Sequence, residues 1–163
     1  MKKIYIILTY TGTILSKIVR IYTRKEYSHV SISLDEDLTK MYSFGRLYPY
    51  NPFLGGFVHE GLDHGTFKRF KKTKTKIYSL EIPEEKYDKI EEIIQTVQSK
   101  KNAYKFNLIG LLGISLGVKI KREKCFYCAE FVKYLLEQSN VVELPDMVKP
   151  EDFEKVNGLS EVY

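Results

Sequence analysis

Cys128 is the residue of this chain best suited to act as a nucleophile. It lies at the start of residues 127–138, a segment in which four apolar residues recur at intervals of a few positions: Phe131, Val132, Leu135 and Leu136. This spacing is typical of one face of a helix, and it directs the Cys128 sulfur toward the core. The positive end of the helix dipole would favour the thiolate, which is the nucleophilic form of cysteine. A buried cysteine that packs as a small hydrophobe is the alternative interpretation.

His29 is the candidate for the base that a nucleophilic cysteine needs. The run around it alternates: Val30, Ile32 and Leu34 share one face, and His29, Ser31 and Ser33 share the other. This alternation predicts a half-buried strand with the imidazole on its polar face. A histidine that only makes a hydrogen bond on a polar face is the alternative.

The strand after His29 suggests Ser43 as a third member of the site. Residues 39–44 read as the return strand of a hairpin. If Leu34 pairs with Leu38 across the turn, His29 faces Ser43 and the two Cβ atoms lie about 5 Å apart. Ser43 would then orient the imidazole.

Other side chains take that role if the strands pair differently. A slip of one residue places Tyr42 or Phe44 opposite His29. Glu60, which we expect in a loop, is a further candidate for orienting the ring.

The blocks that contain these residues resemble the permuted NlpC/P60 group of papain-fold cysteine hydrolases. They are Thr11–Lys17, Tyr27–Leu34 and Phe126–Leu136, and the resemblance extends over nearly the whole chain, including Lys149–Phe153. Lecithin:retinol acyltransferase-like enzymes are distant relatives of that group. The histidine strand precedes the cysteine in such proteins, and His29 precedes Cys128 here. The resemblance implies an α+β, circularly permuted papain-like fold in which an antiparallel sheet carrying His29 packs against the helix carrying Cys128.

The resemblance also implies an activity. Cys128 matches the nucleophile and His29 the general base of a thiol hydrolase or acyltransferase that acts through an acyl-enzyme on an amide or ester. Peptides, cell-wall peptides and lipid-linked acyl groups are the implied substrates, and the backbone N–H of Cys128 would stabilise the oxyanion. The third polar residue of the group, often Glu or His, falls near Ser43, which is a departure. A non-catalytic binding module of the same fold is therefore an alternative.

Two other chemistries could use the same cysteine. Cys125 and Cys128 form a Cys-x-x-Cys motif before a helix, as in thiol redox proteins, but no early strand-helix-strand context surrounds it. A zinc site could combine the cysteines with a histidine, but His59 and His64 are five residues apart, which does not place them on one helical face. We expect neither a metal nor a cofactor.

A basic run is the main charged feature. Six of the 26 basic residues lie between Lys68 and Lys76, interleaved with Phe70, and the formal net charge is +5. Such a run could contact nucleic acid or an anionic surface. A solvated strand edge is the favoured interpretation, which makes nucleic acid an unexpected partner and leaves peripheral contact with anionic surfaces open.

Length and composition predict the number of domains and the cellular compartment. A chain of 163 residues with 44% apolar content predicts one domain, residues 1–163, with an ordinary core. Two adjacent cysteines cannot form a disulfide scaffold, and no leader-like start is recognised, so we expect a reducing, cytoplasmic setting.

The expected elements follow from periodicity and turn residues. Strands are predicted at residues 4–8, 28–34, 39–44 and 77–82. Helices are predicted at residues 14–22, 83 to about 101, 106–118 and 127–138, with a short one at 150–156. We expect Thr13 to cap the first of these helices and the helix at 106–118 to be buried. The segment 45–76 is rich in Gly and Pro and is predicted to be a long loop that shapes the pocket with residues 106–118.

Overall fold

An antiparallel sheet carries the candidate histidine. The computed structural model describes residues 1–48, 51–61 and 73–162, and within them the sheet has six strands in the order β4-β3-β2-β1-β5-β8. Its strands are β1 (Lys2–Tyr10), β2 (His29–Ser33), β3 (Met41–Tyr48), β4 (Asn51–Glu60), β5 (Lys74–Ile82) and β8 (Ser160–Glu161). All neighbouring strands in it are antiparallel. Together with the helices, this confirms the α+β class.

Four α-helices accompany the sheet in the described residues. They are α1 (Ile14–Thr23), α3 (Glu84–Ser99), α4 (Leu108–Ser115) and α5 (Cys128–Gln138). The 3₁₀ turns are η1 (Lys101–Ala103) and η2 (Pro150–Lys155), and the short strands β6 (Lys105–Phe106) and β7 (Cys125–Phe126) pair in parallel. The predicted cap of α1 is confirmed, because Thr13 Oγ1 accepts a hydrogen bond from the Ser16 amide at 3.3 Å.

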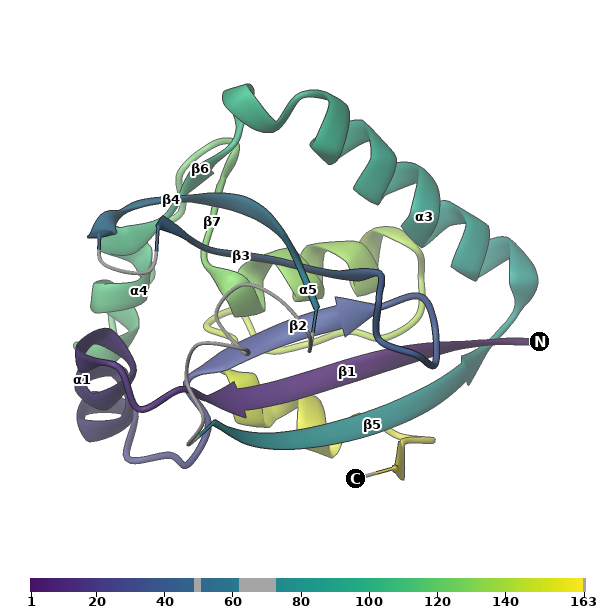
Figure 1. Ribbon diagram of the computed structural model, residues 1–163, viewed down its shortest axis with the longest axis horizontal. Helices are drawn as coiled ribbons and strands as arrows, with labels where there is room; N and C mark the ends of the chain where they lie inside the picture. Colours follow the sequence, from purple (N-terminus) through teal and green to yellow (C-terminus); the bar gives the residue numbers. More distant parts are fainter. Residues whose placement is uncertain (49–50, 62–72, 163) are drawn as a thin grey trace.

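The main core lies between the sheet and α5. Alternate residues of the central strands, such as Ile6 and Ile32, are fully buried against the inward face of this helix. Phe131 of α5 contacts the rings of Phe44 in β3 and Phe57 in β4, with centroids 4.9 and 5.8 Å away. Strands β3 and β4 therefore curve around α5, as Figure 1 shows, while α3 packs beside α5 and also contacts β1.

The hairpin of β2 and β3 has a different register from the predicted one. Ile32 pairs with Tyr42 and Ser33 with Met41, so the turn is longer than expected and Leu34 donates its amide hydrogen bond to Lys40. The pairing is shifted by two residues, which keeps every side chain on its predicted face. The expectation that His29 lies opposite Ser43 is therefore wrong.

The predicted long loop at 45–76 is also wrong in its first half. Strand β3 continues to Tyr48, and β4 runs from Asn51 to Glu60 beside it. Gly45, Gly55 and Gly56 lie within these strands, where Gly55 lets β4 approach Phe106: a Cβ on Gly55 would lie 2.6 Å from that side chain. The glycines signal a close backbone approach rather than a loop.

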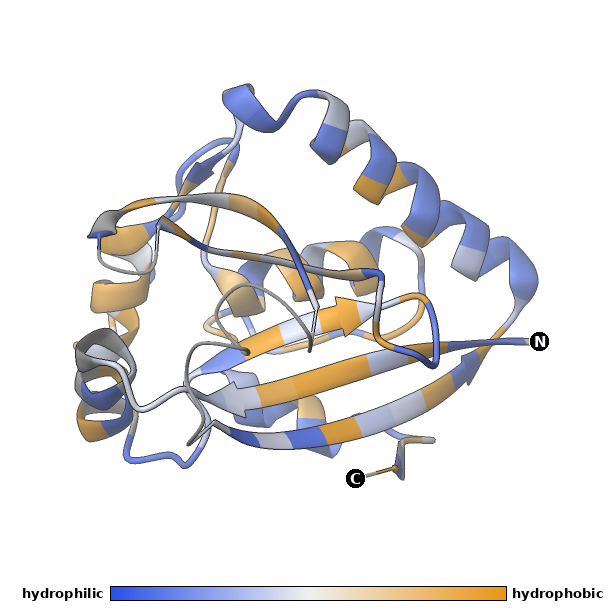
Figure 2. Cartoon of the chain, in the orientation of Figure 1, coloured by the Kyte–Doolittle hydropathy of each residue, from blue (hydrophilic) through white to orange (hydrophobic). Residues whose placement is uncertain are grey.

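The segment predicted as a buried helix is only partly buried. Helix α4 spans eight residues, and Ile114 is buried while Ile109 and Leu112 are 52% and 45% exposed. In Figure 2 this helix is coloured as apolar at the end of the molecule where it lies beside α1.

Candidate active site

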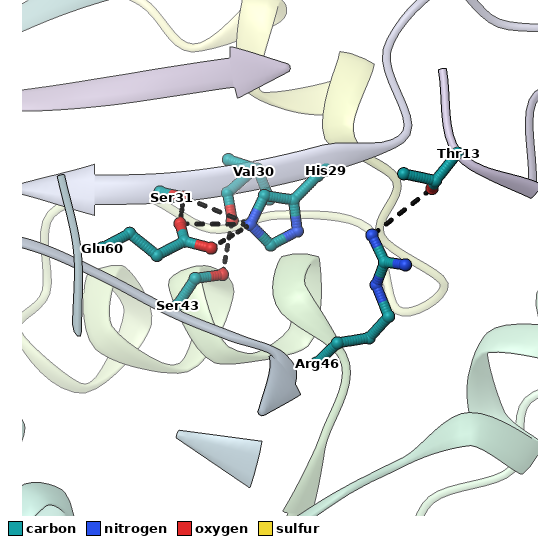
Figure 3. Close-up of polar contacts among 7 residues, drawn as sticks. All are labelled: Thr13, His29, Val30, Ser31, Ser43, Arg46 and Glu60. Atoms are coloured by element: carbon teal, nitrogen blue, oxygen red, sulfur yellow. Dashed lines mark hydrogen bonds and ion pairs between the residues drawn. The ribbon is translucent and has the colours of Figure 1, made fainter. Parts of the chain in front are cut away.

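His29 and Glu60 form an ion pair at the start of β2. Glu60 Oε1 and Oε2 lie 3.2 and 3.3 Å from His29 Nε2, and the two side chains are only 20% and 13% exposed. Ser31 supports the carboxylate, because its hydroxyl donates to Glu60 Oε2 at 2.5 Å. Figure 3 shows both side chains directed at the same edge of the imidazole, while the second ring nitrogen lies on the far side from Glu60.

Glu60 lies two strands away from His29, on the same face of the sheet. Glu60 ends β4 opposite Met41, the first residue of β3, and Met41 in turn lies opposite Ser33 of β2. Extending the β2–β3 register brings Gly45 opposite His29, and a Cβ on Gly45 would lie 3.5 Å from His29 Cε1 and 4.0 Å from Glu60 Oε1. Gly45 therefore lies against the ion pair, at distances where a Cβ would make ordinary van der Waals contact.

Ser43 does not contact the imidazole. Its side chain is fully buried, and its hydroxyl donates to the backbone carbonyl oxygen of Val30 at 2.7 Å. Figure 3 shows this bond running to the β2 backbone. Ser43 therefore cross-links two strands, and Glu60, which the sequence offered as one alternative, makes the contact predicted for Ser43.

Cys128 is held at the first turn of α5 by a network that fixes the helix start. Glu130 Oε2 accepts a hydrogen bond from the Tyr127 amide at 3.2 Å and another from Asn107 Nδ2 at 3.3 Å. Asn107 also caps α4, because its Oδ1 accepts from the Gly110 amide at 3.0 Å. The N-termini of α4 and α5 are thereby tied together, with the 5% exposed Cys128 beside them.

Cys128 and His29 line one small cavity of about 70 Å³. The cavity is walled by residues of β1, α1, β3 and α4 as well, among them Thr9, Val19, Phe44 and Leu111. Since Glu60 takes up Nε2, the Nδ1 nitrogen is the one left for the thiol. The arrangement provides a nucleophile, a base and a carboxylate that orients the base.

The charges in this cavity stabilise the imidazolium. Burial by itself would lower the pKa of His29, but the charge of Glu60, a hydrogen bond with Cys128 and the hydrogen bond with Glu60 together raise that pKa from 6.5 to about 10. Burial opposes ionisation of Glu60 too, yet the His29 charge and the bonds from His29 and Ser31 hold the pKa of the carboxyl below its ordinary value. At neutral pH the pair is therefore charged on both sides.

Further polar groups line the cavity between His29 and α1. The Thr9 hydroxyl is buried, lines the cavity and has no hydrogen-bond partner among the described residues. Arg46 lines the same cavity, and its Nη2 donates to Thr13 Oγ1 at 3.4 Å. These groups give the cavity donors that could hold a carbonyl or a carboxylate of a substrate.

The structure gives less support to a redox pair or a zinc site. Cys125 and Cys128 are both free and buried, with Cys125 on β7 outside the cavity. Within the described ranges, no three His, Cys, Asp or Glu residues lie together as metal ligands. His64 and Lys68–Lys72 of the basic run lie outside the described residues. An open groove of about 950 Å³ between β5 and residues 141–145 contains neither cysteine nor histidine.

Comparison with known proteins adds no assignment. No protein-family model matches the sequence, and no curated protein matches it either.

Alkylation kinetics should distinguish the two cysteines. Iodoacetamide at neutral pH should modify Cys128 faster than Cys125, because Cys128 shares a cavity with the His29 imidazolium and Cys125 lies outside that cavity. His29→Ala should slow the reaction at Cys128 by about tenfold or more and leave the rate at Cys125 unchanged. Mass spectrometry of peptides taken over time gives both rates. Equal rates that do not respond to His29→Ala would contradict the dyad.

Proposed function

We propose that this protein is a thiol hydrolase or acyltransferase that cleaves an amide or ester through an acyl-enzyme on Cys128. The observation that carries the proposal is the shared cavity, in which Cys128 lies at a helix start and His29 is held by Glu60 on its other side. We further propose a circularly permuted papain-like fold of the NlpC/P60 type, supported by the order of His29 before Cys128 and by the packing of α5 on the histidine strand.

The reaction begins with attack of the Cys128 sulfur on the substrate carbonyl carbon. The negative charge that forms on the carbonyl oxygen would be met by amides of the first turn of α5, where helix geometry leaves N–H groups without intrahelical acceptors. His29 then protonates the leaving amine or alcohol from its imidazolium form. The product of this step is the acyl-enzyme, a thioester between the acyl group and the Cys128 sulfur.

The second half of the reaction releases the acyl group. Water, or an alcohol or amine acceptor, approaches the thioester while His29 removes its proton, and the Cys128 sulfur leaves as the thiolate. Glu60 stays ionised throughout and keeps the ring in place, as the carboxylate of a serine hydrolase triad does. The apolar walls at Leu111 and Phe106 favour an acyl or side-chain group of low polarity beside the reacting carbonyl.

Trapping the intermediate tests the proposal directly. The protein should be incubated with panels of peptide amides, muropeptides and activated short-chain acyl esters, and then quenched in acid for intact-mass and peptide analysis. We expect an acyl adduct on Cys128 with at least one class, and a slower adduct with Glu60→Gln. Adducts on lysines alone, or none on Cys128 across all panels while the chain remains folded, would overturn the hydrolase and favour a binding module.

A further inference from the structure

Helix α4 exposes apolar side chains where a helix of a globular protein normally presents polar ones. Its eight residues include no charged side chain and no polar one before Ser115. Ile109, Leu112, Leu116 and Val118, on the helix and just after it, are each at least 45% exposed. A helix that is apolar on all sides is usually buried in protein or in lipid. Part of this one faces solvent instead.

Other exposed apolar residues lie at the same end of the molecule. Helix α1 packs beside α4 and exposes Ile21, while the β3–β4 hairpin exposes Leu47, Tyr48 and Leu54. Close contact between Gly55 and Phe106 places this hairpin next to the start of α4. Figure 1 shows α1, α4, the end of β3 and the start of β4 at one end of the molecule, and Figure 2 shows the apolar colouring of α4 there. We call these eight exposed residues the apolar end.

Basic residues flank the apolar end. Residues 14–24 and 105–124 carry eight basic side chains and one acidic one, Glu123. The basic residues are all exposed: Lys17, Arg20, Arg24, Lys105, Lys119, Lys121, Arg122 and Lys124. The connector folds back along α4, because Asn107 Nδ2 donates to the carbonyl oxygen of Ile120 at 3.0 Å. Lys119 is paired with Asp146, because its Nζ lies 3.0 Å from Asp146 Oδ1. The other cationic side chains flank the exposed leucines and isoleucines in sequence.

We infer that the apolar end docks onto the surface of an anionic phospholipid bilayer. Leucine and isoleucine side chains of α4 would enter the boundary between headgroups and acyl chains, and the flanking lysines and arginines would contact lipid phosphates. The contact is peripheral in the described part of the chain, where no helix has the length and apolarity to cross a bilayer. A second copy of the chain is the less suitable occupant, because a symmetric contact would bring two cationic rims together.

The position of the cavity gives this docking a consequence. Val19 of α1 and Leu111 of α4 line the cavity that holds Cys128 and His29, so the two helices that would touch lipid form part of its wall. A substrate carried in or on the bilayer would therefore meet the thiol without first crossing open water. The docking itself does not depend on the proposed thiol chemistry.

Vesicle co-sedimentation with the full chain tests the inference. Binding should be strong to phosphatidylcholine vesicles containing about 30% phosphatidylglycerol, weak to phosphatidylcholine alone, and reduced by salt. Leu112→Glu combined with Leu116→Glu should lower the partition coefficient about tenfold or more, because it places two anionic groups in the contact. Val162→Glu is the matched control, since Val162 is 42% exposed beside β8 at the opposite edge of the sheet, and it should bind like the wild type.

Charge and chemistry can be tested separately in the same assay. Lys121→Glu with Arg122→Glu should remove most of the preference for anionic vesicles, and Cys128→Ala should bind as the wild type does. Unchanged binding of the Leu112→Glu, Leu116→Glu variant, or no binding of the wild type to either vesicle, would overturn the inference. A dimer seen by light scattering in the wild type and lost in this variant would also overturn the inference, because the apolar end would then be the interface between two copies of the chain.

Discussion

Cys128→Ala should reduce kcat/KM by about 10³-fold or more on whichever ester or amide acylates the protein. The reason is that the substitution removes the atom that forms the covalent bond while leaving the cavity and the Glu60–His29 pair in place. His29→Ala should cause a comparable loss, because the thiolate then lacks both its charge partner and its proton donor. Steady-state kinetics with a chromogenic ester, or chromatography for a peptide, gives the values.

The double variant sharpens this expectation. A nucleophile and a base that act as one unit give losses that do not add, so Cys128→Ala with His29→Ala should lose little more than either alone. Cys125→Ala is the matched control: Cys125 is also buried and free, so removing its sulfur has a similar packing cost, yet kcat/KM should stay near the wild-type value. Activity that survives Cys128→Ala but disappears in Cys125→Ala would assign the chemistry to the Cys-x-x-Cys pair instead.

The sequence predicted the elements around the site well because their patterns are local. The alternation after His29 and the helical spacing after Cys128 each report which face is buried, and the structure has β2 and α5 at these positions. Pro83 followed by two glutamates marks the start of α3 in the same way, and Ile90, Ile94 and Val97 of this helix are buried at helical spacing. Such signals depend on neighbouring residues only.

The residue that contacts His29 could not be predicted from the residues near it in sequence. It depends on the length of the β2–β3 turn and on β4, a strand hidden in sequence by Pro52 and by Gly55 and Gly56. These residues resemble a loop until β3 and Phe106 are known to pack against them, since glycine in a strand then permits the close approach. Once residues 51–60 are known to be a strand, Glu60 lies on the same face as Val58, which is opposite Ser43, and this face is the one that carries His29.

The prediction that residues 106–118 form a buried helix was wrong for a related reason. An apolar stretch such as 108–115 indicates burial, but it does not say whether the burying partner belongs to the same chain. The exposure of Ile109 and Leu112 shows that the partner is not among the described residues. The inference of a lipid surface depends on that three-dimensional fact and on the basic residues that the fold places beside it.

Glu60→Gln should lower kcat/KM by roughly 10²- to 10⁴-fold, the range seen when the carboxylate that orients a catalytic imidazole is neutralised. The amide can still accept from Ser31, so the shape of the cavity is kept while the charge that holds His29 Nε2 is lost. Ser43→Ala is the matched control at a fully buried polar position. It removes the bond to the Val30 carbonyl oxygen, which costs about 1 kcal/mol of stability, and should leave kcat/KM nearly unchanged.

The pH profile separates a positioning role for Glu60 from a merely structural one. In the wild type the pKa of His29 is raised to about 10, so its imidazolium and the activity that needs it should persist until the pH rises toward that value. In Glu60→Gln the charge of Glu60 is gone and burial of His29 is opposed only by its interaction with Cys128, so the pKa of His29 falls and the alkaline limb should move to lower pH. An alkaline limb at the same pH in the wild type and in Glu60→Gln would contradict this role. A limb that moves in Ser43→Ala but stays in place in Glu60→Gln would contradict it as well.

Unfolding stability should follow the same titration without any substrate. A group whose pKa is raised on folding stabilises the folded state fully below its unfolded pKa of 6.5, and this contribution is lost as the pH rises through about 10. Urea unfolding of the wild type should therefore show stability falling between pH 6.5 and 10. Glu60→Gln should be less stable near pH 6.5 and flatter across that window, so the two curves converge at high pH. Parallel curves would show that Glu60 and His29 are not coupled as their geometry indicates, and the orienting role of Glu60 would fail with them.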